Sequence, residues 1–270
     1  SYTGSFMASS VIDGLDLENR FAGMRGLGFA RMMDVGEEAA AEAELARNYG
    51  NPFAVWPVET DQTMRTPIVL LEPQDHKNES ALGYDMYSDP ARRAGMMGAM
   101  AADAPVASGP VQLVQETGEE KQHGFLIFLP YRLPDSEDVA GFVYAPFRAG
   151  DLHTAALTRA LALPVVVETR DVTLEEPSDL YRSPDFEEIA AQSEFSVERA
   201  FDVAGRTWRM TIVATPAFAD GRPGLGVIAL GLISVLLALA LSATVRFQMD
   251  ALESARGLHS NAEKSLKEKD

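Results

Sequence analysis

The feature that most constrains this chain is an uncharged apolar run of 21 residues, Leu225 to Val245. Arg222 and Arg246 are the nearest charged residues on either side. At about 1.5 Å per helical residue, the run covers roughly 30 Å, the thickness of the hydrocarbon core of a bilayer. The alternative is a buried core helix, but such helices rarely lack a polar face over this length. The run therefore predicts a transmembrane helix over residues 225–245.

Charge and cysteine content exclude several classes of function. The chain carries 23 basic and 40 acidic residues, for a net charge of −17. Phosphate backbones need a basic face, so we expect no nucleic acid partner. The stretch from Arg246 to Asp270 is neutral, so the acidic excess lies before the apolar run. The absence of cysteine excludes disulfides, cysteine nucleophiles and iron–sulfur clusters.

The residues after the apolar run have the spacing of a coiled coil. Apolar or weakly polar residues recur there three and four positions apart, namely Leu252, Ala255, His259, Ala262 and Leu266. We predict a coiled-coil linker over residues 246–270 that continues into a longer chain. Basic residues are equally common on both sides of the apolar run, so they do not orient it.

Upstream of the apolar run, the pattern alternates between helices and strands. Residues 1–48 are predicted to be mainly helical from their apolar spacing. Residues 49–162 are predicted to form a first module and residues 163–219 a smaller second one. The strands expected in these modules are residues 53–58 and 67–73 as a hairpin, then 111–115, 124–131, 139–147 and 164–168, and a second hairpin of 194–203 with 207–215. Asp89 and Pro90 predict the start of a helix that reaches Met100 and places Met96, Met97 and Met100 in the core.

No catalytic constellation emerges from the residues. The four histidines are far apart, and none has a partner at metal-binding spacing. No phosphate-binding loop or serine nucleophile motif is present. We therefore expect no enzyme activity, no metal and no cofactor in this part of the chain, and we favour a binding module.

The stretch from Leu82 to Leu152 resembles the CHASE domain, the extracytoplasmic sensory domain of bacterial sensor kinases and cyclases and of plant cytokinin receptors. The matching segments occur in family-like order and spacing. They are GYD, SDPARR, VASGPVQLVQE, GFLIFLPYR and GFVYAPFRAGDL, preceded by MRGLGFA and FAVWP. The resemblance covers about residues 20 to 160.

The resemblance implies an α+β fold with a helical N-terminal segment and tandem PAS-like antiparallel-sheet modules. The membrane-distal module holds the ligand, and a transmembrane helix follows the proximal module. It also implies a location in the bacterial inner membrane, with residues 1–224 in the periplasm and 246–270 in the cytoplasm. Family members have another membrane span upstream, so we expect this chain to be a fragment.

The resemblance also implies a ligand site. Plant receptors hold an adenine-type ligand with an aspartate on the segment that matches GYDM, which makes Asp85 the candidate here; the alternative is that Asp85 caps a loop or the next helix. The other candidate pocket residues are Met86, Val106, Ala107, Ser108, Phe125, Phe128, Tyr131, Tyr144 and Phe147. Strand alternation puts Phe125 and Phe128 on opposite faces, so only one set lines a pocket. Ala107 replaces larger aliphatic residues of the plant pattern, so we expect an unidentified small organic ligand.

The functional hypothesis is small-ligand sensing and transmembrane signalling for a two-component histidine kinase. The run AEKSLKEKD, Ala262 to Asp270, is similar to the stretch that precedes the phosphoacceptor region of such kinases. The expected partners are a small ligand, the lipid bilayer, a second copy of the chain, a kinase domain and a response regulator. Three alternatives stay open. They are a sensor for a membrane diguanylate cyclase, a membrane-anchored enzyme of the envelope that would need an acid/base pair such as Asp85 with His123, and a structural dimerisation or adaptor module without ligand.

Overall fold

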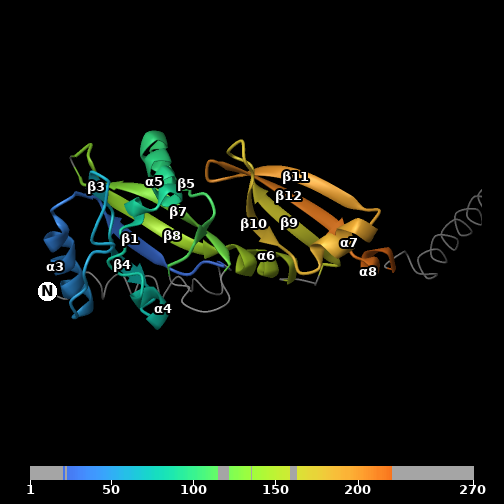
Figure 1. Cartoon of the computed structure of the whole chain (residues 1–270), viewed down its shortest axis with the longest axis horizontal. Coiled ribbons are helices and arrows are strands. Elements are labelled where there is room, and N and C mark those ends of the chain that lie inside the picture. Colours follow the sequence, from blue (N-terminus) through green and yellow to red (C-terminus); the bar gives the residue numbers. More distant parts are fainter. Residues whose placement is uncertain (1–20, 22, 115–121, 135, 159–162, 221–270) are drawn as a thin grey trace, which may run out of the picture. The chain divides into compact units, whose positions relative to one another are not determined.

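The computed structural model describes residue 21 and residues 23–114, 122–134, 136–158 and 163–220 (Figure 1). Two antiparallel sheets and short helices account for most of these residues. No helix in this part of the chain is both long and apolar enough to cross a bilayer. The predicted transmembrane helix, the coiled-coil linker and residues 1–20 of the N-terminal segment lie outside the described residues.

The first sheet has the strand order β4-β1-β8-β7-β5, and β6 also pairs with β7. Its strands are β1 (Leu27–Arg31), β4 (Ile68–Glu72), β5 (Val106–Ala107), β6 (Val111–Gln112), β7 (His123–Arg132) and β8 (Val139–Arg148). A two-stranded ribbon, β2 (Met33–Asp34) with β3 (Met64–Arg65), lies outside it. The long hairpin β7–β8 forms the predicted pairing of the two aromatic strands.

Helices surround the first sheet. They are α3 (Glu38–Tyr49), α4 (His76–Glu79), the 3₁₀ turn η1 (Met86–Ser88) and α5 (Pro90–Ala102). The predicted start of α5 is confirmed, because the Asp89 side chain accepts a hydrogen bond from the Arg92 N–H and Pro90 occupies the first turn. Met96 is buried, but Met97 is 52% exposed, so its predicted place in the core is wrong. It lies one residue beyond the buried stripe of the helix.

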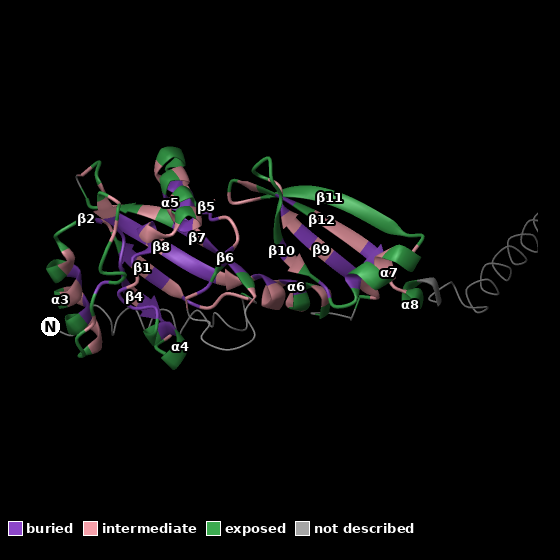
Figure 2. Cartoon of the chain, in the orientation of Figure 1, coloured by how far each residue is buried: buried purple, intermediate pink, exposed green. Residues whose placement is uncertain are grey.

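The second sheet has the order β10-β9-β12-β11. Its strands are β9 (Val165–Asp171), β10 (Ser178–Arg182), β11 (Ser196–Val203) and β12 (Arg206–Ala214). The predicted hairpin of β11 and β12 is confirmed, and Figure 2 shows the edge strand β11 exposed along its length. The accompanying helices are α6 (Ala149–Thr158), α7 (Phe186–Gln192) and α8 (Pro216–Asp220).

The prediction that residues 1–48 are mainly helical is wrong for residues 27–34, which form β1 and β2. In β1 the buried residues alternate with partly exposed ones, which is the periodicity of a strand. The strand also pairs with β4 on one side and β8 on the other. These two ladders of hydrogen bonds decide the conformation, which local apolar spacing cannot show.

The predicted hairpin between residues 53–58 and 67–73 is also wrong. Strand β4 has β1 as its partner on one edge. On its other edge, the N–H and C=O of Ile68 bond to Tyr84 and Gly83. Both edges of β4 are therefore occupied. The 53–58 segment contributes only an isolated bridge between Trp56 and Tyr84.

The first sheet takes part in two apolar cores. Leu126 and Phe128 belong to the large core that also contains residues of α3, β4 and α5. Phe125 belongs to a smaller core that includes Trp208 of β12 and Leu180 of β10. Consecutive residues of β7 thus face different cores, as the strand alternation predicted.

Candidate functional site

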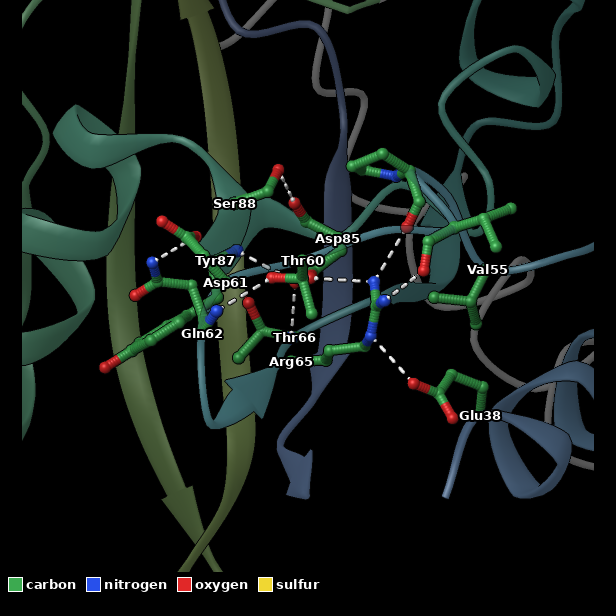
Figure 3. A network of polar contacts seen from close by, with 12 residues as sticks. Glu38, Val55, Thr60, Asp61, Gln62, Arg65, Thr66, Asp85, Tyr87 and Ser88 are labelled. Atoms are coloured by element: carbon green, nitrogen blue, oxygen red, sulfur yellow. Dashed lines mark hydrogen bonds and ion pairs between the residues drawn. The ribbon is translucent and has the colours of Figure 1, made fainter. Parts of the chain in front are cut away.

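Asp85, the aspartate carried over from the family resemblance, is fully buried just before η1. Its Oδ1 accepts hydrogen bonds from the backbone N–H of Thr66, at 2.7 Å, and of Tyr87, at 3.0 Å. Its Oδ2 lies 3.3 Å from Nη1 of Arg65. The carboxylate thus caps η1 and fixes it to the start of β4 (Figure 3).

Arg65 is the buried cation that Asp85 faces. Its Nη1 donates to the carbonyl of Pro57 at 2.8 Å and its Nη2 to that of Val58 at 2.6 Å. Its Nε lies 2.8 Å from a carboxylate oxygen of Glu38 (Figure 3). The guanidinium therefore connects α3, the 57–58 loop and Asp85. Breaking such a buried pair leaves an uncompensated charge, so this network is a structural feature of the module.

Burial raises the pKa of Asp85 above its usual range, and the hydrogen bonds from Thr66, Tyr87 and Arg65 oppose this shift. Both carboxylate oxygens have donors within the protein. These contacts match the alternative in which Asp85 has a structural role: it caps the following turn η1 and pairs with Arg65. A contact between Asp85 and a ligand stays a prediction.

A small cavity lies next to this network, inside the first module. Its volume is about 10 Å³, roughly the space that one water molecule needs. The residues that line it come from β4, the 81–86 segment, α5, the 113–114 segment, β7 and β8. They are Ile68, Ala81, Tyr84, Met86, Arg92, Leu113, Val114, Leu126, Tyr144 and Pro146. Two predicted site residues, Met86 and Tyr144, are therefore cavity residues, whereas Asp85 is not one of them.

Arg92 brings a positive charge to this cavity from the first turn of α5. The residue is only 4% exposed. Its Nη2 donates to the carbonyl of Gln112 at 2.7 Å, and its Nη1 lies 3.3 Å from the Tyr84 hydroxyl and 3.1 Å from Oδ2 of Asp89. The guanidinium also lies over the Tyr84 ring, 5.2 Å from its centroid. These contacts hold the charge in one place beside apolar walls.

Tyr144 contributes a buried hydroxyl from the middle of β8. Its neighbour in the adjacent strand is Gly28, and a Cβ at that position would lie 2.6 Å from the Tyr144 ring. The glycine therefore makes room for the ring against β1. The hydroxyl has no hydrogen-bond partner in the described structure. Burial raises the pKa of Tyr144 well above its usual value, which keeps the hydroxyl protonated and able to donate.

The structure divides the remaining predicted site residues. Phe128 packs beside Tyr144, with ring centroids 6.3 Å apart, on the same side of the sheet. Phe125 and Phe147 stack at 5.0 Å on the opposite side. Phe125 also meets Trp208 edge to face at 4.9 Å. Tyr131 is 43% exposed and packs against Phe29.

Three further candidates lie in the short strand β5, Val106 and Ala107, and directly after it, Ser108. Val106 is partly exposed, and Ala107 is fully buried against the second sheet. The Ser108 hydroxyl donates to the carbonyl of Gly109 at 2.7 Å and accepts from the N–H of Leu126 at 3.0 Å. None of the three is among the residues that line the cavity.

Sequence reasoning missed Arg92 and Tyr84 as site residues. Arg92 belongs to the SDPARR segment, which was interpreted only as a helix start. An arginine at the third residue of a helix tells nothing by itself about burial. The usable signal was its position next to the GYDM segment, which folds against the same cavity.

A larger hollow of about 290 Å³ lies elsewhere on the module, between the end of α3 and α4. Its walls include Tyr49, Phe53 and Leu71, and its polar residues include Asp75 and Glu79. Asp75 caps α4 by accepting from the N–H of Asn78. The Tyr49 hydroxyl accepts from the Leu71 N–H at 2.8 Å. These groups serve the fold, and none of the predicted site residues lines this hollow.

The chain is similar to several solved sensor domains at low identity. An extracellular ligand binding receptor from Desulfohalobium retbaense DSM5692 is 13% identical, with a TM-score of 0.45; the match covers 77% of this chain and 33% of that one. This chain therefore spans about a third of the length of that receptor. The periplasmic sensory domain of the Campylobacter jejuni chemoreceptor Tlp1 is 9% identical, with a TM-score of 0.40 and coverage of 81% and 87%.

A third similar structure is the ligand binding domain of the Pseudomonas aeruginosa PAO1 amino acid chemoreceptor PctC in complex with GABA. It is 13% identical, with a TM-score of 0.35 and coverage of 71% of this chain and 74% of that one. No curated protein matches the sequence. The assignment of the chain therefore depends on the family match.

That match is to the CHASE domain and extends over residues 9–181, well over half of the chain. It includes both strands of the aromatic hairpin, α5 and the cavity. It also reaches the first two strands of the second sheet. The chain therefore belongs to the CHASE domain family, the family of extracytoplasmic sensory domains that its motifs resemble.

Proposed function

We propose that this chain senses a small organic ligand outside the cytoplasm and passes the signal across the membrane to a histidine kinase. The observation that carries the proposal is the internal cavity of the first module. It is lined mainly by apolar side chains, and its walls include the buried Arg92 and the Tyr144 hydroxyl, which has no hydrogen-bond partner among the described residues. Apolar walls with a few fixed polar groups are typical of small-molecule sites.

The proposed route of the signal runs from the cavity of the first module through the second sheet. In this proposal, ligand binding changes the packing of the cavity walls on β7 and α5. The change reaches β12 through the contacts of β5 and β7 with the second sheet. The predicted transmembrane helix, residues 225–245, and the linker 246–270 transmit it to a kinase domain and a response regulator. A coupling of about 1–3 kcal/mol between ligand and output is typical of such systems.

The proposed location is the bacterial inner membrane, with residues 1–224 in the periplasm and 246–270 in the cytoplasm. The family and the apolar run support this orientation. The proposed active form is a homodimer, because the coiled-coil spacing of the linker needs a second helix. The chain itself binds and transmits, and carries out no catalysis.

A thermal-shift screen tests the proposal. The purified chain is heated with small acids, amino acids and adenines, and we expect at least one compound to raise the melting temperature. Ala81→Leu places extra methyl groups against the cavity from a buried position and should abolish that shift. Ala40→Leu, on the exposed side of α3, is the matched control and should keep it.

The proposal fails if no compound stabilises the chain, and the adaptor alternative then gains support. It also fails if the Ala81 and Ala40 variants respond equally to the stabilising compound, since binding would then lie outside the cavity. Circular dichroism of both variants without ligand checks that each one is folded.

A further inference from the structure

The cavity walls have one sign of charge. Among the described residues that line the cavity, Arg92 carries the only formal charge. Seven of the others are aliphatic, thioether or proline side chains, namely Ile68, Ala81, Met86, Leu113, Val114, Leu126 and Pro146. The dielectric is low in such surroundings, so electrostatic interactions with Arg92 are strong. A ligand that entered would meet a fixed positive charge.

Arg92 keeps donor capacity after its own contacts are counted. A guanidinium has five N–H groups. The described contacts are one hydrogen bond to Gln112, one to Tyr84 and the ion pair with Asp89. Asp89 also caps α5 through its Oδ1, is 28% exposed and is not among the residues that line the cavity. The guanidinium can therefore still donate to an acceptor inside the cavity.

The Tyr144 hydroxyl is a second donor, and none of the described residues accepts a hydrogen bond from it. A buried polar group without a hydrogen bond lowers stability, so such groups are rare and need an explanation. Tyr49 provides the contrast, because its equally phenolic hydroxyl accepts from the Leu71 N–H and donates to the Leu71 carbonyl. The fold can thus provide hydrogen-bond partners for a tyrosine hydroxyl in this core, as it does for Tyr49. Among the described residues it provides none for the hydroxyl of Tyr144, which lines the cavity.

We propose that the ligand is a small organic acid whose carboxylate accepts hydrogen bonds from both Arg92 and the Tyr144 hydroxyl. This inference rests on the proposed sensor function and specifies the chemistry of its ligand. Charge-assisted bonds from arginine to a carboxylate are among the strongest in proteins. The aliphatic walls contact the carbon chain of the acid.

The size of the cavity limits that carbon chain. At about 10 Å³ the present space holds little more than a water molecule. The acid must therefore bind a state in which the walls have separated, and a chain of two to four carbons requires the least separation. A ligand that binds only the wider state shifts the population toward it, which is how binding produces a signal.

Adenines and cationic amines fit these walls less well. Arg92 repels the positive charge of an amine, and a neutral adenine cannot form the charge-assisted pair with Arg92 that a carboxylate forms. The carboxylate that could accept them, Asp85, already receives hydrogen bonds from Thr66 and Tyr87 and faces Arg65. It is also not among the cavity residues.

Isothermal titration calorimetry of the purified chain tests the ligand class. The probes are acetate, propionate and pyruvate, with acetamide and propionamide as neutral isosteres, plus adenine, in a buffer free of organic acids. We expect at least one of the acids to bind, and each amide to bind at least about tenfold more weakly than its acid, because it cannot form a charge-assisted pair. Equal affinity for acid and amide would overturn the inference.

Two tyrosine variants separate binding from folding. Tyr144→Phe should weaken binding of the acid about tenfold or more and leave the melting temperature of the free chain unchanged or higher, because it removes an unsatisfied hydroxyl. Tyr49→Phe is the matched control and should lower that temperature while keeping the affinity. If Tyr144→Phe keeps full affinity for the acid, the hydroxyl is not a ligand contact and the inference fails.

Arg92 variants complete the test. Arg92→Lys keeps the charge and should bind the acid with intermediate affinity, whereas Arg92→Gln should not bind it. Circular dichroism verifies the fold of both, and the Tyr144 variant decides the question if Arg92→Gln unfolds. If adenine or an amide binds and no acid does, the proposal of an organic acid as ligand is overturned, but the proposed sensor function is not. If none of the probes and no compound in the thermal-shift screen binds, the sensor function fails with it.

Discussion

The backbone N–H of Ala107 donates to the carbonyl of Ala204 at 2.9 Å, which joins β5 of the first sheet to the β11–β12 turn of the second. A Cβ at Gly95 of α5 would lie 3.1 Å from Cα of Ser108, so the helix that carries Arg92 packs closely on this connection. A Cβ at Gly205 of the same turn would lie 3.7 Å from a side-chain methyl of Val106. A displacement of α5 therefore reaches β12 through few intermediates.

The turn itself yields the first prediction. Ala204 has a φ of 47°, in the left-handed region that glycine adopts without steric cost. Ala204→Gly should raise the free energy of unfolding by roughly 0.5–1 kcal/mol. The control Ala200→Gly, in the exposed strand β11, should lower it. Urea unfolding followed by circular dichroism measures both, and destabilisation by Ala204→Gly would contradict the strain argument.

The Asp85 network yields the second prediction. Asp85→Asn keeps an acceptor for the N–H of Thr66 but removes the charge that faces Arg65. We expect a loss of about 2–4 kcal/mol in the free energy of unfolding, because the buried guanidinium loses one of its two carboxylate partners. Asp103→Asn breaks the exposed pair with Arg132 and should cost less than about 1 kcal/mol. Equal effects of the two variants would mean that the Asp85 pair is not structural.

His153 gives a prediction for pH. Its Nδ1 lies 2.7 Å from the carbonyl of Ala149, which can only accept, so Nδ1 carries the hydrogen and Nε2 accepts from the Thr169 hydroxyl at 2.8 Å. The imidazole stacks on Tyr181 at 4.4 Å. Burial lowers the pKa of His153, and the hydrogen bond to Ala149 opposes the shift.

The sign of the effect follows from proton linkage. Because the pKa of His153 is lower in the folded chain, the unfolded chain binds more protons as the pH falls below about 6.5. The melting temperature should therefore drop between pH 7.5 and 5.5, more steeply in the wild type than in His153→Gln. The exposed His123 provides the control His123→Gln, which should retain the wild-type slope. Parallel curves for wild type and His153→Gln would refute the assignment.

Membrane topology can be tested directly because the chain has no cysteine. Ser196→Cys lies on the exposed strand β11, and Ser260→Cys lies beyond the apolar run. A membrane-impermeant maleimide added to spheroplasts should label the first and not the second. Permeabilised cells, in which both cysteines should react, provide the control. Labelling of both cysteines in intact spheroplasts would contradict the predicted orientation.

Much of the fold could be predicted where local patterns and tertiary structure agree. The β7–β8 and β11–β12 hairpins have short polar connections between alternating strands, and Asp89 with Pro90 marks the start of α5. Residues 27–34 could not be predicted, because their strand conformation depends on pairing with β4 and β8, which are distant in sequence. Strand β10 is largely exposed and polar, so it has no apolar pattern to recognise.

The candidate site was predictable only in outline. The family resemblance led to segments that line the cavity, and Met86 and Tyr144 are among its lining residues. The burial of Arg92 depends on where α5 packs, and the missing partner of the Tyr144 hydroxyl depends on the distance to every surrounding polar atom. Neither property is encoded in a local pattern. Both properties are the basis of the ligand chemistry proposed for the cavity.

Strand β7 separates two compartments. Leu126 touches the cavity, whereas its neighbour Phe125 meets Trp208 in the second sheet. The indole N–H of that tryptophan has no hydrogen-bond partner in the part of the chain that the structure describes. If β7 moves away from the cavity to admit a ligand, the aromatic side chains on its other face move toward the second sheet by the same distance. In the proposed sensor, the strand that lines the ligand cavity is thus also the strand that transmits ligand binding to the second sheet.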